Sequence, residues 1–382
     1  MRFVSVDQLG MEYNLLWPPE IFREEVEGIL RNRNVIPSMR GHRLLREAFE
    51  DEAVAREYIG TLPQWELDQR PITQRDYLTF LSRNAEELHN RSVGGPYWLE
   101  RSGIEVPKIE EAETTLREDF LSLVDQLIDL GYFEKRAPRP CLNNYGVDEP
   151  STDEGINVLV GRMLRVPNLW IRLRQTDFED DYLYAIVEVL HDIVSRPIHW
   201  WNDPQNDCGP HYDEFNMPVG QKVYRWKVNE LLRRHGRELK LAESGENAGR
   251  LIRTFSQPMD ELRASVTSHT DEANQNVVEH AISMFERRGA TREQKRSACV
   301  NLAGVLEQRR SLIKEHLTSS DERMLFEIAN KFDLRHRNAR QNSDYSEDFL
   351  DWIFWIYLAT VELTNRIIQT KVSESSDEDE LW

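Results

Sequence analysis

The chain has 382 residues, of which 40% are hydrophobic, and it carries a formal net charge of −19 at pH 7. This length predicts two or three domains with substantial cores, and the apolar content, which includes ten tryptophans, excludes a generally disordered chain. The acidic balance disfavours nonspecific wrapping around nucleic acid, because the mean field of the protein repels phosphate, so any nucleic-acid site must be a local basic patch.

Cysteine usage and apolar runs indicate the compartment. The three cysteines, Cys141, Cys208 and Cys299, are scattered and form no CxxC pair, which is typical of a reduced cytoplasmic protein. The N-terminus has no signal-peptide apolar core, and the longest apolar run, Trp352–Val361, is about half of the ~20 residues that a membrane span needs. We therefore expect a cytoplasmic protein with no membrane among its partners.

Residues 1–150 are predicted to form an N-terminal helical region. Apolar spacing and helix-end signals predict helices over Pro19–Leu30, Thr73–Leu88 and Glu110–Leu130, the last ending at a glycine. The segment Pro138–Thr152 is rich in proline and lacks an apolar period, so it is the predicted linker to the next part of the chain.

Residues 151–270 are predicted to form a small mixed α/β module. Apolar residues at helical spacing predict helices over Asp180–Val194 and Pro218–His235. The segments Glu238–Leu241 and Arg250–Arg253 flank a glycine-containing turn, a pattern that predicts a short hairpin.

Residues 271–370 are predicted to form a four-helix bundle, followed by an acidic, disordered tail over residues 371–382. Apolar residues recur at helical spacing in four segments, over residues 272–288, 291–313, 319–332 and 346–370. Capping boxes at Thr291 with Gln294 and at Ser319 with Glu322 mark two helix starts, and Ser346 is the expected N-cap of the last helix. Short links predict antiparallel neighbours, so the predicted fold is mainly α.

The last helix, Phe349–Ile367, is apolar on both sides. Trp352 and Ile356 follow one face, and Phe354 and Leu358 follow the opposite face. A helix of this kind is buried on both sides, inside its own bundle and against a partner. We therefore expect a homodimer that forms through this helix.

A basic link joins the last two helices of the predicted bundle, and it reverses the sign of an otherwise acidic chain. Its cations and imidazole are Lys331, Arg335, His336, Arg337 and Arg340. The link predicts a site for a polyanion. The alternative is a purely structural role, in which the cations pair with neighbouring acids or cap the preceding helix. These acids are Asp333, Asp344, Glu347 and Asp348.

The residue types in the basic link suit RNA chemistry. Cleavage without a metal needs a group that moves the 2′-hydroxyl proton and cations that hold the phosphate. Arg335 and Arg337 can each give a bidentate fork to phosphate, and His336 titrates near neutrality. Asn338 could orient the nucleotide. The expected RNA contacts around these candidate catalytic residues are Lys331, Arg340 and Gln341.

A basic Arg/His/Asn link that feeds the last helix of a C-terminal bundle resembles the HEPN superfamily, over Asp271–Thr370. It is also similar to the C-terminal regions of bacterial abortive-infection (phage-defence) proteins. The resemblance implies a metal-independent ribonuclease whose site is built across a dimer interface. Arg335-His336 and Arg337-Asn338 each match the start of the family motif, whereas Gln341-Asn342-Ser343 stands where the family has a downstream histidine. That difference favours a non-catalytic member.

Arg309 and Arg310, one helix earlier, form a rival site with His316. Arg309 and His316 are seven residues apart, about two helical turns, so a continuous helix would place them on one face. Their position in the bundle does not match the family pattern, and a solvated helix end is the preferred interpretation.

A second basic patch contains Arg233 and Arg234, close to the end of a predicted helix. These arginines could extend an RNA track, although cations at a helix C-terminus also suit the helix dipole.

One group of residues has zinc-like spacing, with Cys208 and His211 three apart and His191 and His199 nearby. Structural zinc sites usually have two close ligand pairs, and this group has one, so the packing of His211 on Trp201 is the preferred interpretation. No metal and no cofactor is predicted.

Three functions therefore remain open. The first is a defence-type endoribonuclease that uses the basic link, and the second is a non-catalytic module that binds RNA or a nucleotide through the same cations. The third is an interaction protein whose link docks acidic segments, including its own tail at Asp377–Glu380.

Overall fold

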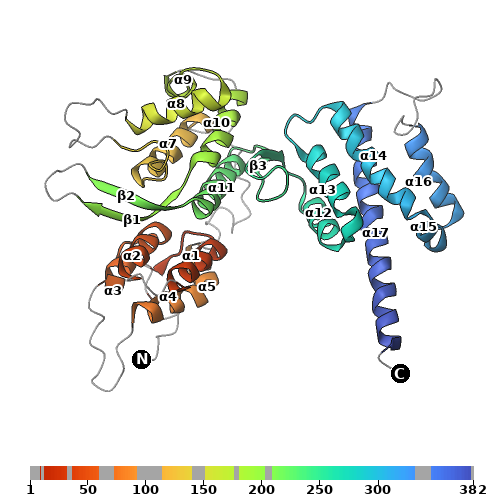
Figure 1. Ribbon diagram of the computed structural model, residues 1–382, viewed down its shortest axis with the longest axis horizontal. Helices are drawn as coiled ribbons and strands as arrows, with labels where there is room; N and C mark the ends of the chain where they lie inside the picture. The colour runs from red at the N-terminus through yellow and green to blue at the C-terminus, as the bar shows by residue number, and fades with distance from the viewer. Residues whose placement is uncertain are drawn as a thin grey trace, which may run out of the picture. The chain divides into compact units, whose positions relative to one another are not determined.

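The structure is a computed structural model that describes residue 9 and residues 13–31, 37–59, 73–92, 114–139, 151–175, 180–202, 209–331 and 346–379. The chain divides into two compact units, Met1–Lys227 and Val228–Trp382 (Figure 1). Both units are mainly helical, which confirms the predicted mainly-α fold. The finer division at residues 150, 270 and 370 remains a prediction, and the boundary between the units lies within α11 (Met217–Arg234).

The first unit begins with a group of short helices: α1 (Pro19–Arg31), α2 (Pro37–Ala48), α3 (Ala53–Ile59), α4 (Gln74–Arg83) and α5 (Ala85–Ser92). Helix α1 confirms the prediction for this stretch, because Phe22, Val26 and Ile29 recur at helical spacing and are all buried. The single helix predicted over Thr73–Leu88 is two helices. Asn84 ends α4, since its side-chain amide donates to the carbonyl of Phe80 at 2.8 Å.

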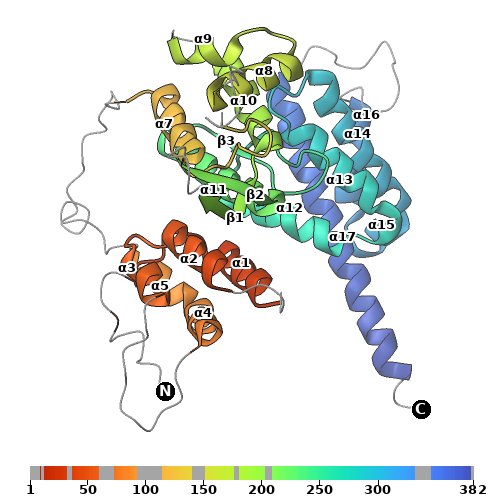
Figure 2. The ribbon, with the colours of Figure 1, turned by 60° about the vertical axis from the view of Figure 1, so that its left-hand side comes forward.

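The rest of the first unit packs helices around a two-stranded hairpin. The elements are α7 (Leu116–Asp129), α8 (Thr152–Leu164), α9 (Leu169–Gln175), α10 (Asp180–Ile193), β1 (Arg196–Asn202) and β2 (Pro210–Asn216). Strands β1 and β2 are antiparallel, and the hairpin lies between α2 and α7 (Figures 1 and 2). The sequence did not predict this hairpin, because Pro197 and an irregular register at His199 break the alternation that identifies strands.

The second unit is a helical bundle with one small hairpin. The elements are β3 (Leu239–Leu241), β4 (Leu251–Arg253), α12 (Gln257–His269), α13 (Glu272–Glu286), α14 (Arg292–Gln308), α15 (Arg310–His316), α16 (Ser319–Lys331) and α17 (Glu347–Asp379). The predicted β3–β4 hairpin is confirmed. The bundle core is aromatic, and the rings of Phe285 and Phe354 stack with centroids 3.7 Å apart. None of the helices in the described ranges has a stretch long and apolar enough to span a bilayer.

Several details of the bundle differ from the sequence prediction. Helix α12 packs on α17 and adds to the four expected helices. The N-cap of α16 is Thr318 and not the predicted Ser319, since the hydroxyl of Thr318 accepts from the amide of Asp321 at 3.3 Å. Glu322, the predicted partner of Ser319, instead accepts from Arg310 at 2.8 Å. The tail predicted to be disordered is helical as far as Asp379, since extending a formed helix is far easier than starting one.

Candidate functional site

The core of the predicted site lies outside the described residues. These residues are Arg335, His336, Arg337, Asn338, Arg340 and Gln341. Lys331 is the last residue of α16, and its side chain is also outside the described part of the structure. The helices on both sides are described, and Tyr357 of α17 donates its hydroxyl to the carbonyl of Leu325 in α16 at 3.3 Å. The flanking helices therefore pack on each other.

The acids at the start of α17 test the alternative that the cations of the basic link only pair with neighbouring acids. The carboxylate of Glu347 lies 3.2 Å from the ammonium of Lys295 in α14. The carboxylate of Asp348 accepts from the hydroxyl of Ser346, the predicted N-cap, at 2.8 Å. One of the four acids that could neutralise the link, Glu347, is therefore paired with a cation of α14, whereas Asp348 only bonds the neutral hydroxyl of its neighbour Ser346.

The second basic patch is partly accounted for by its own helix. Both Arg233 and Arg234 are exposed near the end of α11. Arg233 donates to the carboxylate of Glu230, one turn earlier, at 2.6 and 3.0 Å. The hydrogen bond from Arg233 lowers the pKa of Glu230, so this pair stays charged and mutually balanced at neutral pH. Arg234 is therefore the residue of this patch that could still contribute to RNA binding.

Arg309 corrects the interpretation of the rival site as a solvated helix end. The side chain is only 7% exposed, and Nη1 donates to the Thr364 hydroxyl and to the Asn365 side-chain oxygen, both at 2.7 Å. Nη2 pairs with the carboxylate of Asp271, the N-cap of α13. The predicted single helix breaks at Arg309, so His316 lies exposed at the end of α15 and does not share a face with it. Arg309 joins α13, α14 and α17.

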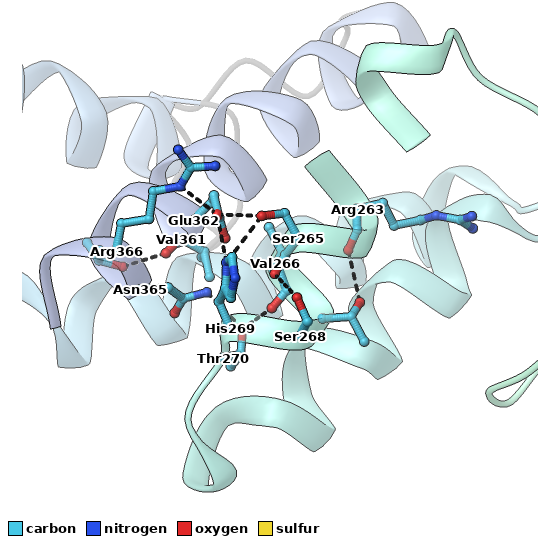
Figure 3. A network of polar contacts seen from close by, with 12 residues as sticks. Arg263, Ser265, Val266, Ser268, His269, Thr270, Val361, Glu362, Asn365 and Arg366 are labelled. Carbon is cyan, nitrogen blue, oxygen red and sulfur yellow. Dashed lines mark hydrogen bonds and ion pairs between the residues drawn. The ribbon is translucent and has the colours of Figure 1, made fainter. Parts of the chain in front are cut away.

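A second polar cluster connects α12 to α17 (Figure 3). Glu362 Oε1 accepts from Ser265 Oγ at 2.6 Å and from Arg366 Nε at 2.8 Å, and it lies 3.0 Å from His269 Nδ1. Burial acts to raise the pKa of Glu362, but the hydrogen bonds from Ser265, Arg366 and His269 outweigh it and lower that pKa. Glu362 is therefore a carboxylate at neutral pH.

The residue types of this cluster invite comparison with a nucleophilic triad, but the geometry is different. In a triad, the serine meets one ring nitrogen of the histidine and the acid meets the other. Here, Ser265 Oγ lies 3.2 Å from His269 Nδ1, the same nitrogen that approaches Glu362, and the serine donates directly to the acid. The cluster therefore fastens two helices and does not activate the serine.

The zinc-like group does not come together in the described residues. Cys208 lies outside them. His199 Nδ1 is 2.6 Å from Asp213 Oδ1, and His211 stacks on Trp201 with centroids 4.5 Å apart, which confirms the packing expected for His211. Within the described ranges, no three potential ligands are close enough to hold a metal ion.

The first unit contains a buried charge network that sequence reasoning missed. Arg196, at the start of β1, is 1% exposed and pairs with Glu25 of α1 and, at 2.9 Å, with Glu47 of α2. Glu47 also accepts from the hydroxyl of Tyr132 at 2.9 Å. The Arg196 guanidinium lies 5.3 Å from the centre of the Trp17 ring. No local pattern reveals this network, because its members are far apart in sequence.

The comparisons with known proteins add no family to this picture. No family model, no curated protein and no solved structure matches the chain.

Proposed function

We propose that the second unit binds RNA through the basic link between α16 and α17, and that His336 is the group that would make the same site a metal-independent nuclease. The observation that carries the proposal is the ion pair between Glu347 and Lys295 of α14, which takes one acid away from the link. The three acids that remain, Asp333, Asp344 and Asp348, are outnumbered by four cations, which are Lys331, Arg335, Arg337 and Arg340. An excess of positive charge on a chain of net charge −19 favours a local phosphate site.

RNA binding to the purified protein in EDTA tests the proposal. Arg335→Ala should weaken binding of a single-stranded RNA by roughly fivefold to tenfold and reduce the salt dependence by about one phosphate contact, because one guanidinium fork is lost. Arg31→Ala is the matched control, since Arg31 is an exposed arginine of the first unit that pairs with Glu27. Equal losses in both variants, or no RNA binding by the unchanged protein, would contradict the proposal.

His336→Ala separates cleavage from binding in the same assay. If the link is catalytic, product formation in EDTA should be lost in this variant while the RNA affinity stays within about twofold. Binding without product would identify the non-catalytic module, and product that persists in His336→Ala would rule out this histidine as the acid–base group. A role in phage defence remains a prediction of the family resemblance.

The proposal includes a homodimer through α17. Phe349, Trp352 and Leu363 are 46%, 48% and 44% exposed, whereas their neighbours Ile353 and Leu358 are fully buried in the bundle. With Ile356 and Ala359 they follow a three–four spacing, which is the seam of a two-stranded coiled coil. A second copy of the helix is the partner that such a seam fits.

Trp352→Glu combined with Leu363→Glu should convert the dimer to a monomer, because two charges would be buried at the seam. Sedimentation equilibrium of the full chain measures the change. Met324→Glu is the control, since Met324 is 62% exposed on α16, away from the seam. An unchanged protein that is already monomeric at micromolar concentration would contradict the dimer.

A further inference from the structure

The first unit contains a cavity between α2, the end of α7 and the β1–β2 hairpin. Its volume is about 380 Å³, within the range of roughly 300–1,000 Å³ that is typical of small-molecule sites. The cavity is lined by residues that are distant in sequence, from His42 to Tyr212. None of them belongs to the basic link or to the bundle.

One wall of the cavity is aromatic and rigidly held. Trp200 and Tyr212 are directly opposite each other in the β1–β2 ladder, so their side chains share one face of the hairpin. The Tyr212 ring packs against Gly131, where a Cβ atom would approach it to 2.3 Å, and only a glycine fits there. The guanidinium of Arg43 lies 4.8 Å from the centre of the same ring.

The cations that line the cavity already have carboxylate partners. Arg43 Nε lies 2.7 Å from Glu47 Oε1, and Arg46 Nη2 donates to Glu52 Oε1 at 2.7 Å. Burial, together with the neighbouring Arg46, lowers the pKa of His42, so its imidazole is neutral at pH 7. The charges of Arg43 and Arg46 are therefore each balanced by a carboxylate, which weakens their attraction for an anionic ligand.

Asp129 is the charged lining residue whose carboxylate has no hydrogen-bond or ion-pair partner among the described residues; its backbone carbonyl accepts from Arg139. The charges of the other lining residues are paired, whereas the exposed carboxylate of Asp129 is free to pair with a ligand that lies beside Trp200. Aromatic faces and a carboxylate together are the groups that recognise organic cations in proteins. We propose that this cavity binds a small organic cation, whose ammonium or guanidinium group pairs with Asp129 while its remaining atoms lie against Trp200.

Isothermal titration calorimetry of the full chain with agmatine tests the site. Asp129→Asn should weaken agmatine binding by about tenfold or more, since it removes the charge of the ion pair and preserves the shape of the side chain. Glu87→Gln is the matched control, because it removes one exposed negative charge from α5 of the same unit. An agmatine affinity that is equal in the unchanged protein and in Asp129→Asn would overturn the proposal.

Two further arms define the ligand. A blocked arginine, acetylated and amidated, should bind if the natural ligand is a basic side chain of a peptide; agmatine binding alone would identify a free amine or guanidine. Trp200→Leu should weaken whichever ligand binds by a few fold, because the face of the indole is lost. Binding of inorganic phosphate or AMP at this cavity, with no binding of either guanidinium compound at millimolar concentration, would overturn the assignment.

Discussion

Replacing Arg196 with methionine is expected to lower the free energy of unfolding of the first unit by roughly 3–5 kcal/mol, because the substitution leaves buried carboxylates without a counter-charge. Arg196 is 1% exposed, and the side chains of its partners Glu25 and Glu47 are 7% and 4% exposed. Methionine fills much of the same volume, so the loss reports on charge and not on a cavity. Denaturant unfolding measures it, with hydrogen exchange in α1, α2 and β1 assigning the transition to this unit.

Two further variants test the cause of this loss. Arg23→Met breaks an ion pair with Glu86 at 3.0 Å on the surface and should change stability by less than about 1 kcal/mol. Adding Glu25→Gln and Glu47→Gln to Arg196→Met removes the unpaired charges and should restore part of the lost stability. If Arg196→Met alone is as mild as Arg23→Met, the network does not hold the unit together.

Arg309→Leu is expected to destabilise the second unit by roughly 2–4 kcal/mol, because it leaves several buried polar groups without a hydrogen-bond partner. Thr364 and Asn365 are each 1% exposed and both accept from this guanidinium, and Asp271 would lose its cation. The measurement is denaturant unfolding of the full chain, with exchange protection in α14 and α17 as the local readout.

Arg310→Leu is the control that the chain itself offers for Arg309. The two arginines are adjacent, but the Arg310 side chain is 41% exposed, and it pairs with Glu307 at the surface and with the buried Glu322. We expect a smaller loss for Arg310→Leu than for Arg309→Leu, since only Glu322 loses a cation and the exposed pair with Glu307 contributes little. Equal losses in the two variants would show that the burial of Arg309 has no energetic consequence.

The same pair shows what the sequence could and could not predict. Local signals predicted well, because their physics is local: the capping box of Thr291 with Gln294 and the glycine end of α7 both occur as expected. The inward turn of Arg309 depends on Asp271 and on residues of α17, and no spacing within α14 reveals it. Arg310 is the same residue type at the next position, yet its side chain is 41% exposed whereas that of Arg309 is 7% exposed.

The candidate sites divide in the same way. The basic link was visible in the sequence because its charges are consecutive, and its catalytic role remains a prediction. The cavity of the first unit was not visible, since Asp129 and Trp200 become neighbours only after α2 and the hairpin have packed. Arg196 was equally hidden: as a single arginine before a proline, it carries no signal of burial.

The sequence separations in the buried network have a consequence for protein synthesis. Arg196 is 149 residues from Glu47 and 171 residues from Glu25. On the ribosome, α1 and α2 emerge long before β1 is translated. Until then, the carboxylates of Glu25 and Glu47 have no Arg196 to pair with and cannot be buried. A nascent chain stalled before residue 196 therefore cannot form these ion pairs, and Glu25 and Glu47 stay hydrated until β1 has been translated.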